Sequence, residues 1–249
     1  MDQILAEALE AVKPSRGDPV LAYFEYHHRR YQFTLQKVAA VAAGRSLRIL
    51  DVGCYPTFMS DALRELGHTV FGASSEHESV AKPDVEILNI ESEPFPWDDG
   101  LFDLVIFAEV VEHLIQSPVP PLREMWRTTA AGGHLFISTP NIASARHRLH
   151  LLAGRTIMFP LDDYFRDGGG GGTPYGRHNR EYTLKELAEL TRRTGWETID
   201  AGYVMAYPLA FIQTGGWRRK LALPIKVAAH RLIPEAEDTI YVVGQKAST

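Results

Sequence analysis

Short apolar runs separated by helix-length stretches are the feature of this sequence that most restricts its fold. Runs of this length and composition are typical of buried parallel strands. They cover residues 47–53, 68–72, 85–88, 102–107 and 133–138. Strands that alternate with helices at this spacing predict βαβ units and a parallel sheet. A chain of 249 residues can build one α/β domain of this kind.

Helical spacing of apolar residues predicts the helices around these strands. Thr183 and Glu186 form the capping-box pattern that starts one of them. The predicted helices cover residues 4–13, 20–43, 57–66, 119–130 and 183–195, and a basic helix covers 216–232. Two more strands, at 196–204 and 239–243, complete the expected order of elements.

Composition narrows the class of protein. The 26 basic and 31 acidic residues give a net charge of −5, which argues against a general nucleic-acid-binding protein. No apolar run reaches the length that spans a bilayer, and the first residues lack the basic start of a signal peptide. Cys54 is the only cysteine, so no internal disulfide can form. We therefore expect a cytoplasmic enzyme.

Residues 140–182 interrupt the alternation of strands and helices. This stretch has no clean periodicity and contains five consecutive glycines at 168–172. Glycine runs lose much backbone entropy when they become ordered, and long insertions in compact domains are usually functional. We expect this insertion to act as a lid.

Four motifs occur in a fixed order along the chain. They are LDVGC at 50–54, FPWDDGLFDLV at 95–105, EVVEHL at 109–114 and GGHL at 132–135. Together they resemble the class I S-adenosylmethionine-dependent methyltransferases. The resemblance implies a Rossmann-like three-layer α/β sandwich, with a seven-stranded, mostly parallel sheet whose last strand is antiparallel. It also implies a single methyltransferase domain over residues 1–249, with an N-terminal helical cap at 1–44 and a lid insertion at about 140–182.

The same resemblance assigns residues to the cofactor. Asp51, Gly53 and Cys54 are expected at its methionine part. Asn89, Ile90 and Glu91 are expected at its adenine, and Phe107, Ala108 and Glu109 in the floor under its sulfonium. Tyr31 and Arg30 could reach the cofactor carboxylate. The sequence departs from the family pattern at Tyr55-Pro56-Thr57, where a second glycine is usual. It also has Ser74 in place of the acid that usually holds the ribose, with Glu76 two residues later.

Methyl transfer to an alcohol requires a base, and histidine is the usual base near neutral pH. The candidates are His113, His147 and His178, and His27 and His28 on the N-terminal helix are alternatives. For substrate binding we expect Arg146 and the aromatic residues Tyr175 and Tyr182, since aromatic rings stack on pyranose faces.

These polar groups, and a looser resemblance to sugar-modifying methyltransferases, favour O-methylation of a saccharide hydroxyl, for example in methylmannose-type polysaccharide synthesis. Two alternatives remain: methylation of a small lipid, quinone or amine, and a catalytically silent binding protein of this fold. Mg²⁺ could bind to Glu109, Glu112 and the Asp162-Asp163 pair, because hard cations prefer carboxylates. The basic helix should pack on the sheet. Membrane contact through 217–232 or a homodimer face is the alternative.

Overall fold

A seven-stranded mixed sheet forms the centre of the molecule. The computed structural model describes residues 1–75, 82–158, 162, 165, 176–205 and 234–248. Within these residues the strand order is β3-β2-β1-β4-β5-β7-β6. The strands are β1 (Arg48–Val52), β2 (Thr69–Ser74), β3 (Val85–Ile87), β4 (Phe102–Ala108), β5 (Thr129–Pro140), β6 (Glu197–Val204) and β7 (Thr239–Gln245). The first five strands pair in parallel, and β7 is antiparallel to both of its neighbours. The predicted Rossmann-like fold is confirmed.

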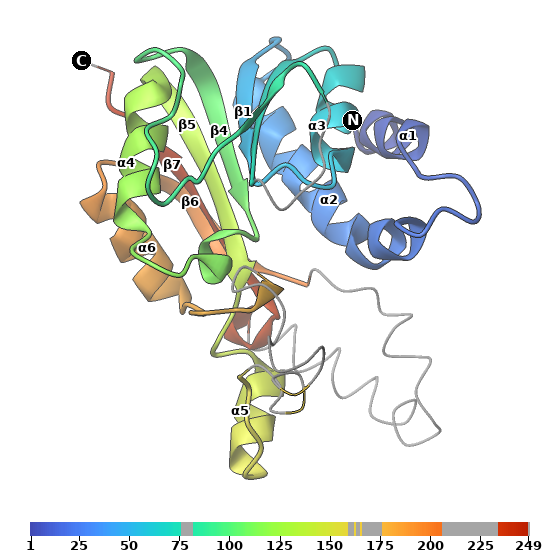
Figure 1. Cartoon of the computed structure of the whole chain (residues 1–249), viewed down its shortest axis with the longest axis vertical. Helices are drawn as coiled ribbons and strands as arrows, with labels where there is room; N and C mark the ends of the chain where they lie inside the picture. The colour runs from blue at the N-terminus through green and yellow to red at the C-terminus, as the bar shows by residue number, and fades with distance from the viewer. Residues whose placement is uncertain (76–81, 159–161, 163–164, 166–175, 206–233, 249) are drawn as a thin grey trace.

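Helices cover both faces of this sheet (Figure 1). On one face lie α1 (Asp2–Ala11), α2 (Leu21–Ala42) and α3 (Phe58–Glu65), and on the other lie α4 (Val119–Thr128) and α6 (Leu184–Arg193). Alternate residues of the central strands point to opposite faces because the side-chain period of a strand is two. Ile49, Leu104 and Ile106 join the core under α1–α3, whereas Leu50, Val105 and Phe107 join the core under α4 and α6.

The helix α2 is attached to the sheet by both apolar and charged contacts. Its Phe24 and Leu35 are almost fully buried. Lys37 donates from Nζ to Asp200 on β6 at 2.7 Å and to the Tyr241 hydroxyl on β7 at 3.0 Å. These contacts hold the predicted N-terminal cap against the strands that follow it by more than 150 residues.

Most predicted elements are confirmed, and the exceptions have physical reasons. Thr183 and Glu186 form the expected capping box at the start of α6. The strand β5 begins at Thr129, earlier than expected, because residues 129–132 continue the strand that pairs beside β4. The basic helix expected at 216–232 lies outside the described residues, as do 159–161, 163–164 and 166–175 of the expected lid.

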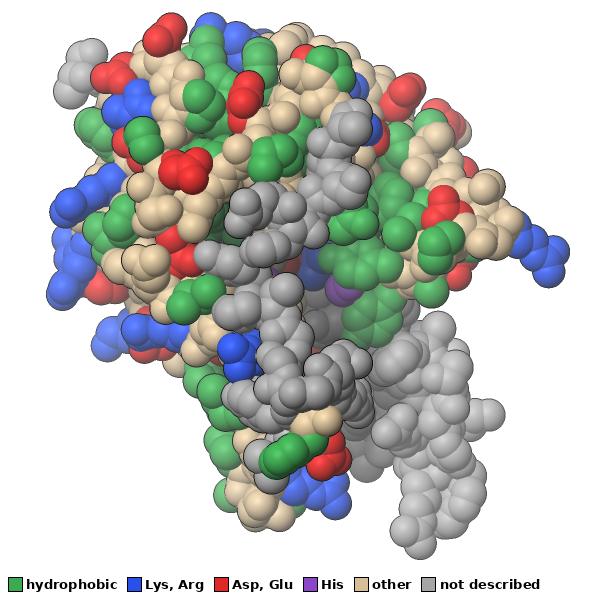
Figure 2. All heavy atoms as spheres, viewed as in Figure 1, with side chains coloured by type: hydrophobic (Ala, Val, Ile, Leu, Met, Phe, Trp, Pro, Cys, Tyr) green, Lys and Arg blue, Asp and Glu red, His purple; other side chains and the backbone are tan. Residues whose placement is uncertain are grey.

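The sequence pattern did not predict α5 (Ala145–Leu152), a helix without a buried residue. Figure 1 shows it standing away from the sheet, and in the same view in Figure 2 this part of the molecule projects from the main body. Leu149, Leu151 and Leu152 are all exposed on it.

None of the helices in the described part of the chain has the length and hydrophobicity of a membrane-spanning segment.

Replacing Leu35 by alanine should weaken the attachment of α2. The side chain is 0% exposed, so its loss should lower the free energy of unfolding by about 2–5 kcal/mol. Urea denaturation measures the change. The matched control is Leu152→Ala, because Leu152 is 84% exposed and its truncation should change stability by less than about 0.5 kcal/mol. Equal effects of the two substitutions would contradict this description of the core.

Candidate cofactor and active site

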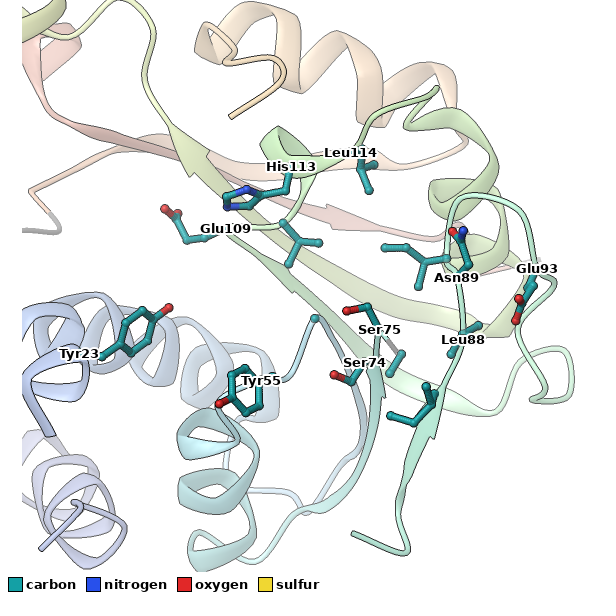
Figure 3. Close-up of a pocket in the computed structure, with 15 residues that line it drawn as sticks. Tyr23, Tyr55, Ser74, Ser75, Leu88, Asn89, Glu93, Glu109, His113 and Leu114 are labelled. Atoms are coloured by element: carbon teal, nitrogen blue, oxygen red, sulfur yellow. The ribbon is translucent and has the colours of Figure 1, made fainter. Parts of the chain in front are cut away.

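A cavity of about 430 Å³ lies where β1, β2 and β4 end (Figure 3). Its volume falls in the range of small-molecule sites. Figure 3 shows Ser74 and Ser75 at the end of β2, Asn89 and Glu93 beyond β3, and Glu109 and His113 after β4. The remaining lining residues are Tyr23, Gly53, Tyr55, Ala73, Ile87, Leu88, Ile90, Val110 and Leu114.

The turn after β1 fits against the segment after β4 only because residue 53 is glycine. Gly53 has φ +78°, in the left-handed region that side chains disfavour. A Cβ atom at this position would lie 2.3 Å from Cγ2 of Val110. The Gly53 amide donates to the Ala73 carbonyl at 2.8 Å, which ties the turn to β2. The backbone therefore forms the wall of the cavity directly.

A smaller cavity of about 70 Å³ adjoins the first and shares Tyr23, Gly53, Tyr55 and Glu109 with it. Residues expected at the methionine end and its carboxylate line this smaller cavity, namely Arg30, Tyr31, Asp51 and Cys54, together with Ala108, which was expected in the floor under the sulfonium. The Tyr55-Pro56 pair does not fill the space, and Tyr55 remains 43% exposed.

Asp51 is buried beneath this smaller cavity. Ser60 donates from its hydroxyl to Oδ2 of Asp51 at 2.6 Å. Burial raises the pKa of Asp51 to about 6, despite this hydrogen bond. The carboxylate is therefore ionised near neutral pH, and this buried charge lowers the stability of the folded state. Ionisable groups with shifted pKa values of this kind are common in functional sites.

At the expected adenosine end, the residues separate into two groups. Ser74, Asn89 and Ile90 line the large cavity. Glu91 does not line it: its side chain is buried and accepts a hydrogen bond from the Gln116 amide. Glu76 lies outside the described residues.

Two further assignments need correction because the side chains point into the core. Phe107 is 0% exposed and packs under α4 and α6, so it does not form a floor for the cofactor. Tyr182 is 4% exposed in the same core, with the Arg180 guanidinium over its ring, so it offers no stacking surface to a sugar. Arg146 is exposed on α5, and Tyr175 lies outside the described residues.

Several cavity residues were not identified from the sequence. Tyr23, Ser75, Ile87, Leu88, Glu93, Val110 and Leu114 line the large cavity. Their positions in the sequence could have identified most of them, because they end or directly follow a predicted strand or lie within or beside one of the four motifs. Tyr23 carries no such signal, because it reaches the cavity from α2.

Carboxylates gather after β4. Glu109 has φ +58° and accepts from Arg30 Nη1 at 3.2 Å and from the Ser138 hydroxyl at 2.9 Å. Glu112 is 1% exposed and accepts from the Thr139 hydroxyl at 2.9 Å. Burial is the main cause that raises the pKa of Glu112, and the negative charge of the neighbouring Glu109 raises it further.

Two of the three histidines expected to be catalytic, His113 and His178, lie beside this carboxylate pair. The rings of His113 and His178 have centroids 4.9 Å apart. His178 Nδ1 lies 2.9 Å from Glu181 Oε1, and this hydrogen bond raises the pKa of His178. His147 Nδ1 lies 3.2 Å from the other Glu181 oxygen. The structure thus brings His113 to the cavity wall, His178 next to it, and His147 behind Glu181.

The carboxylates expected to bind Mg²⁺ do not form one group. Glu109 already pairs with Arg30, Asp162 is exposed, and Asp163 lies outside the described residues. In the described part of the chain, the metal-ligating side chains that come together are Glu112, His113 and His178, whose ligand atoms lie within 4.8 Å of one another.

This sheet order, with a cavity at the ends of β1 and β4, defines the class I S-adenosylmethionine-dependent methyltransferase fold. A family model described as a methyltransferase domain matches residues 23–201, so the chain belongs to the methyltransferase domain family. The expected enzyme class, a methyltransferase that uses S-adenosylmethionine, is confirmed at this level.

Solved structures support the fold. A SAM-dependent methyltransferase from Archaeoglobus fulgidus has a TM-score of 0.57 at 14% identity, covering 92% of this chain and 100% of that one. One from Mesorhizobium loti has a TM-score of 0.55 at 17% identity, covering 83% and 96%.

A more similar sequence is named ubiquinone biosynthesis O-methyltransferase. The Rhizobium etli protein is 27% identical over 180 residues, covering 66% of this chain and 65% of its own length. This chain therefore spans slightly less than two thirds of that relative. The looser resemblance to sugar-modifying methyltransferases has no counterpart among these findings.

Gly53→Ala should reduce the affinity for S-adenosylhomocysteine by more than tenfold, because the new methyl group meets Val110. Isothermal titration calorimetry measures the affinity. Gly67→Ala is the matched control: Gly67 has a similar φ of +84°, but a Cβ atom there would meet nothing within 4 Å. It should lose about 1 kcal/mol of stability and keep the affinity. Unchanged binding by Gly53→Ala would contradict the proposed location.

The stability of Asp51→Asn should depend on pH. The folded-state pKa of about 6 lies above the ordinary 3.8, so the wild type loses stability as pH rises through this interval. The variant should gain up to about 3 kcal/mol relative to wild type between pH 4 and pH 7. Urea unfolding across this range measures it, with Asp98→Asn as the exposed control. A difference that does not vary with pH would contradict the buried charge.

Proposed function

We propose that this chain transfers a methyl group from S-adenosylmethionine to a hydroxyl oxygen of a small quinol or phenol. The observation that carries the proposal is the cavity at Gly53, which ends at Glu109 and His113. The name of the Rhizobium etli relative supports an O-methyltransferase and a quinone-type acceptor.

The residues around the two cavities suit this cofactor. Ser74 and Asn89 offer hydroxyl and amide groups to a ribose and a base, and the bare Gly53 backbone allows close approach. Arg30 can bind a carboxylate at the other end, where it lines the smaller cavity. When bound, S-adenosylmethionine supplies an electrophilic methyl group.

The chain itself contributes position, exclusion of water and a place for the hydroxyl proton. Tyr23, Val110 and Leu114 give the cavity apolar surface. Holding two reacting groups in line can supply several kcal/mol of the barrier, about 7–11 kcal/mol in well-oriented cases. His113 is the imidazole on the cavity wall, and it can contact the acceptor oxygen there.

A quinol or phenol fits the site better than the saccharide expected from sequence. Tyr182 is unavailable for stacking because it is in the core. Aromatic and aliphatic side chains that line the cavity together with His113, including Tyr23, Val110 and Leu114, favour a planar apolar ring. The Rhizobium etli relative carries ubiquinone in its name and no sugar, which favours the quinone alternative.

The partner expectations remain predictions. They are no binding of nucleic acid and packing of the basic helix on the sheet, with a homodimer face or membrane contact through 217–232 as the alternatives; residues 217–232 lie outside the described residues. A cytoplasmic location is likewise a prediction.

The proposal is tested with the purified chain, S-adenosylmethionine and a panel of quinols, phenols, mannosides and amines. Mass spectrometry should detect methyl adducts with quinols or phenols, with formation of S-adenosylhomocysteine. His113→Ala should lower kcat by about 10²–10⁴-fold, the range for loss of general acid–base help. His134→Ala, on β5 and outside the cavity lining, is the matched histidine control and should leave kcat unchanged.

Three results would overturn parts of this proposal. Methylation of mannosides alone would replace the acceptor with a sugar. Methylation of amines alone would replace the oxygen nucleophile. No binding of S-adenosylhomocysteine at millimolar concentration would leave the catalytically silent protein as the better interpretation.

A further inference from the structure

We propose that Glu112, His113 and His178 bind a divalent transition-metal ion at the wall of the large cavity. The residues come from two segments: η1 (Val111–His113), directly after β4, and the segment before α6. The site itself stands on this geometry. Its role in methyl transfer rests on the function proposed above.

The three ligand atoms already lie close together. All are within 4.8 Å of one another, and His113 Nε2 is 3.8 Å from Glu112 Oε1. Nitrogen and oxygen ligands lie about 2.0–2.2 Å from zinc, so two ligands of a tetrahedral ion are about 3.3 Å apart. Side-chain movements that together amount to about 1.5 Å or less would close this difference.

Hydrogen bonds orient both imidazoles for coordination. His113 Nδ1 lies 3.0 Å from the Arg177 carbonyl, which can only accept, so Nδ1 carries the proton and the neutral ring has its lone pair at Nε2. His178 Nδ1 similarly faces the Glu181 carboxylate at 2.9 Å. Metal-binding histidines usually donate their other ring N–H to a carbonyl or a carboxylate. Both partners are present here.

The charges around the cluster favour a cation. Glu112 is almost fully buried, and a buried carboxylate is costly without a compensating cation. Arg30, the nearby guanidinium, is paired with Glu109 instead. A divalent ion between Glu112 and the two imidazoles would supply the compensating charge directly.

The second segment is held in place by the first. The amides of Asn179 and Arg180 donate to the Glu112 carbonyl at 2.7 and 3.2 Å, and the Asn179 side chain donates to the His113 carbonyl at 2.8 Å. These bonds place His178 next to His113 independently of any ion. His147, 3.2 Å from Glu181, is then a positioning residue for the carboxylate that orients His178.

Two imidazoles and one carboxylate suit Zn²⁺, Fe²⁺, Co²⁺ or Ni²⁺ better than Mg²⁺. Three protein ligands also leave a coordination position for a substrate. In methyl transfer with the ion bound, His113 would be a ligand and no longer the base named above, so an acceptor hydroxyl that binds at the open position would release its proton to water. Its oxygen would form the new bond to the methyl carbon as the carbon–sulfur bond breaks, with the electron pair remaining on sulfur.

Cobalt titration of the full chain after EDTA treatment tests the site. Equilibrium dialysis with elemental analysis should give about one Co²⁺ per chain, and visible absorption should show the ligand-field bands of a nitrogen- and oxygen-bound ion. Glu112→Gln and His178→Ala should each weaken Co²⁺ binding by more than tenfold. His150→Ala is the matched control, because His150 lies on α5 outside the cluster.

The outcomes separate this inference from the proposed function. Circular dichroism checks folding, and the half-exposed His178 provides the test if Glu112→Gln does not fold. Binding of S-adenosylhomocysteine by a chain that binds no Co²⁺ would overturn the metal site and leave the methyltransferase proposal intact. Unchanged Co²⁺ affinity in His178→Ala would also overturn it, whereas one Co²⁺ with no S-adenosylhomocysteine binding would support the site and contradict the function.

Discussion

The crevice at the carboxyl ends of β1 and β4 is the constraint on which the rest of the site depends. The chain adds β2 and β3 on one side of β1 and then places β4 on the other side. The connections after β1 and β4 therefore run in opposite directions and leave a gap between them, as in other open α/β sheets. Gly53 lets the two segments meet without filling that gap, because a side chain there would collide with Val110.

This arrangement also explains why the polar chemistry gathers at one end of the cavity. The strand β4 ends at Ala108, so Glu109, Glu112 and His113 follow at the rim of the sheet. The neighbouring β5 supplies Ser138 and Thr139, whose hydroxyls donate to the two carboxylates. Adjacent parallel strands thus position both the acids and their hydrogen-bond donors.

The fold could be predicted from the sequence because buried strands and capped helices leave local patterns. The apolar runs located all five parallel strands, and Thr183 located the start of α6. The helix α5 escaped prediction because none of its residues is buried, so it has no periodic apolar face. The antiparallel direction of the last strand came from the family resemblance, whereas the position of β7 between β5 and β6 was not predicted.

The site was only partly predictable, since local sequence does not say which way a side chain points or which distant segment packs beside it. Gly53, Ser74, Asn89 and Glu109, which were assigned to the cofactor, line the large cavity. Phe107 was misassigned because the alternation of β4 turns it toward α4 and α6. The position of His178 beside His113 depends on long-range hydrogen bonds to the Glu112 carbonyl, which no sequence spacing encodes.

The central claim is that S-adenosylmethionine binds in the crevice between β1 and β4 with its methyl group toward His113. A crystal structure of the full chain with S-adenosylhomocysteine tests this most directly. We expect the adenine beside Asn89 and Ile90, and the sulfur on the side of Glu109 and His113. A ligand bound away from the Gly53 turn, or one whose sulfur faces Asn89, would contradict the account.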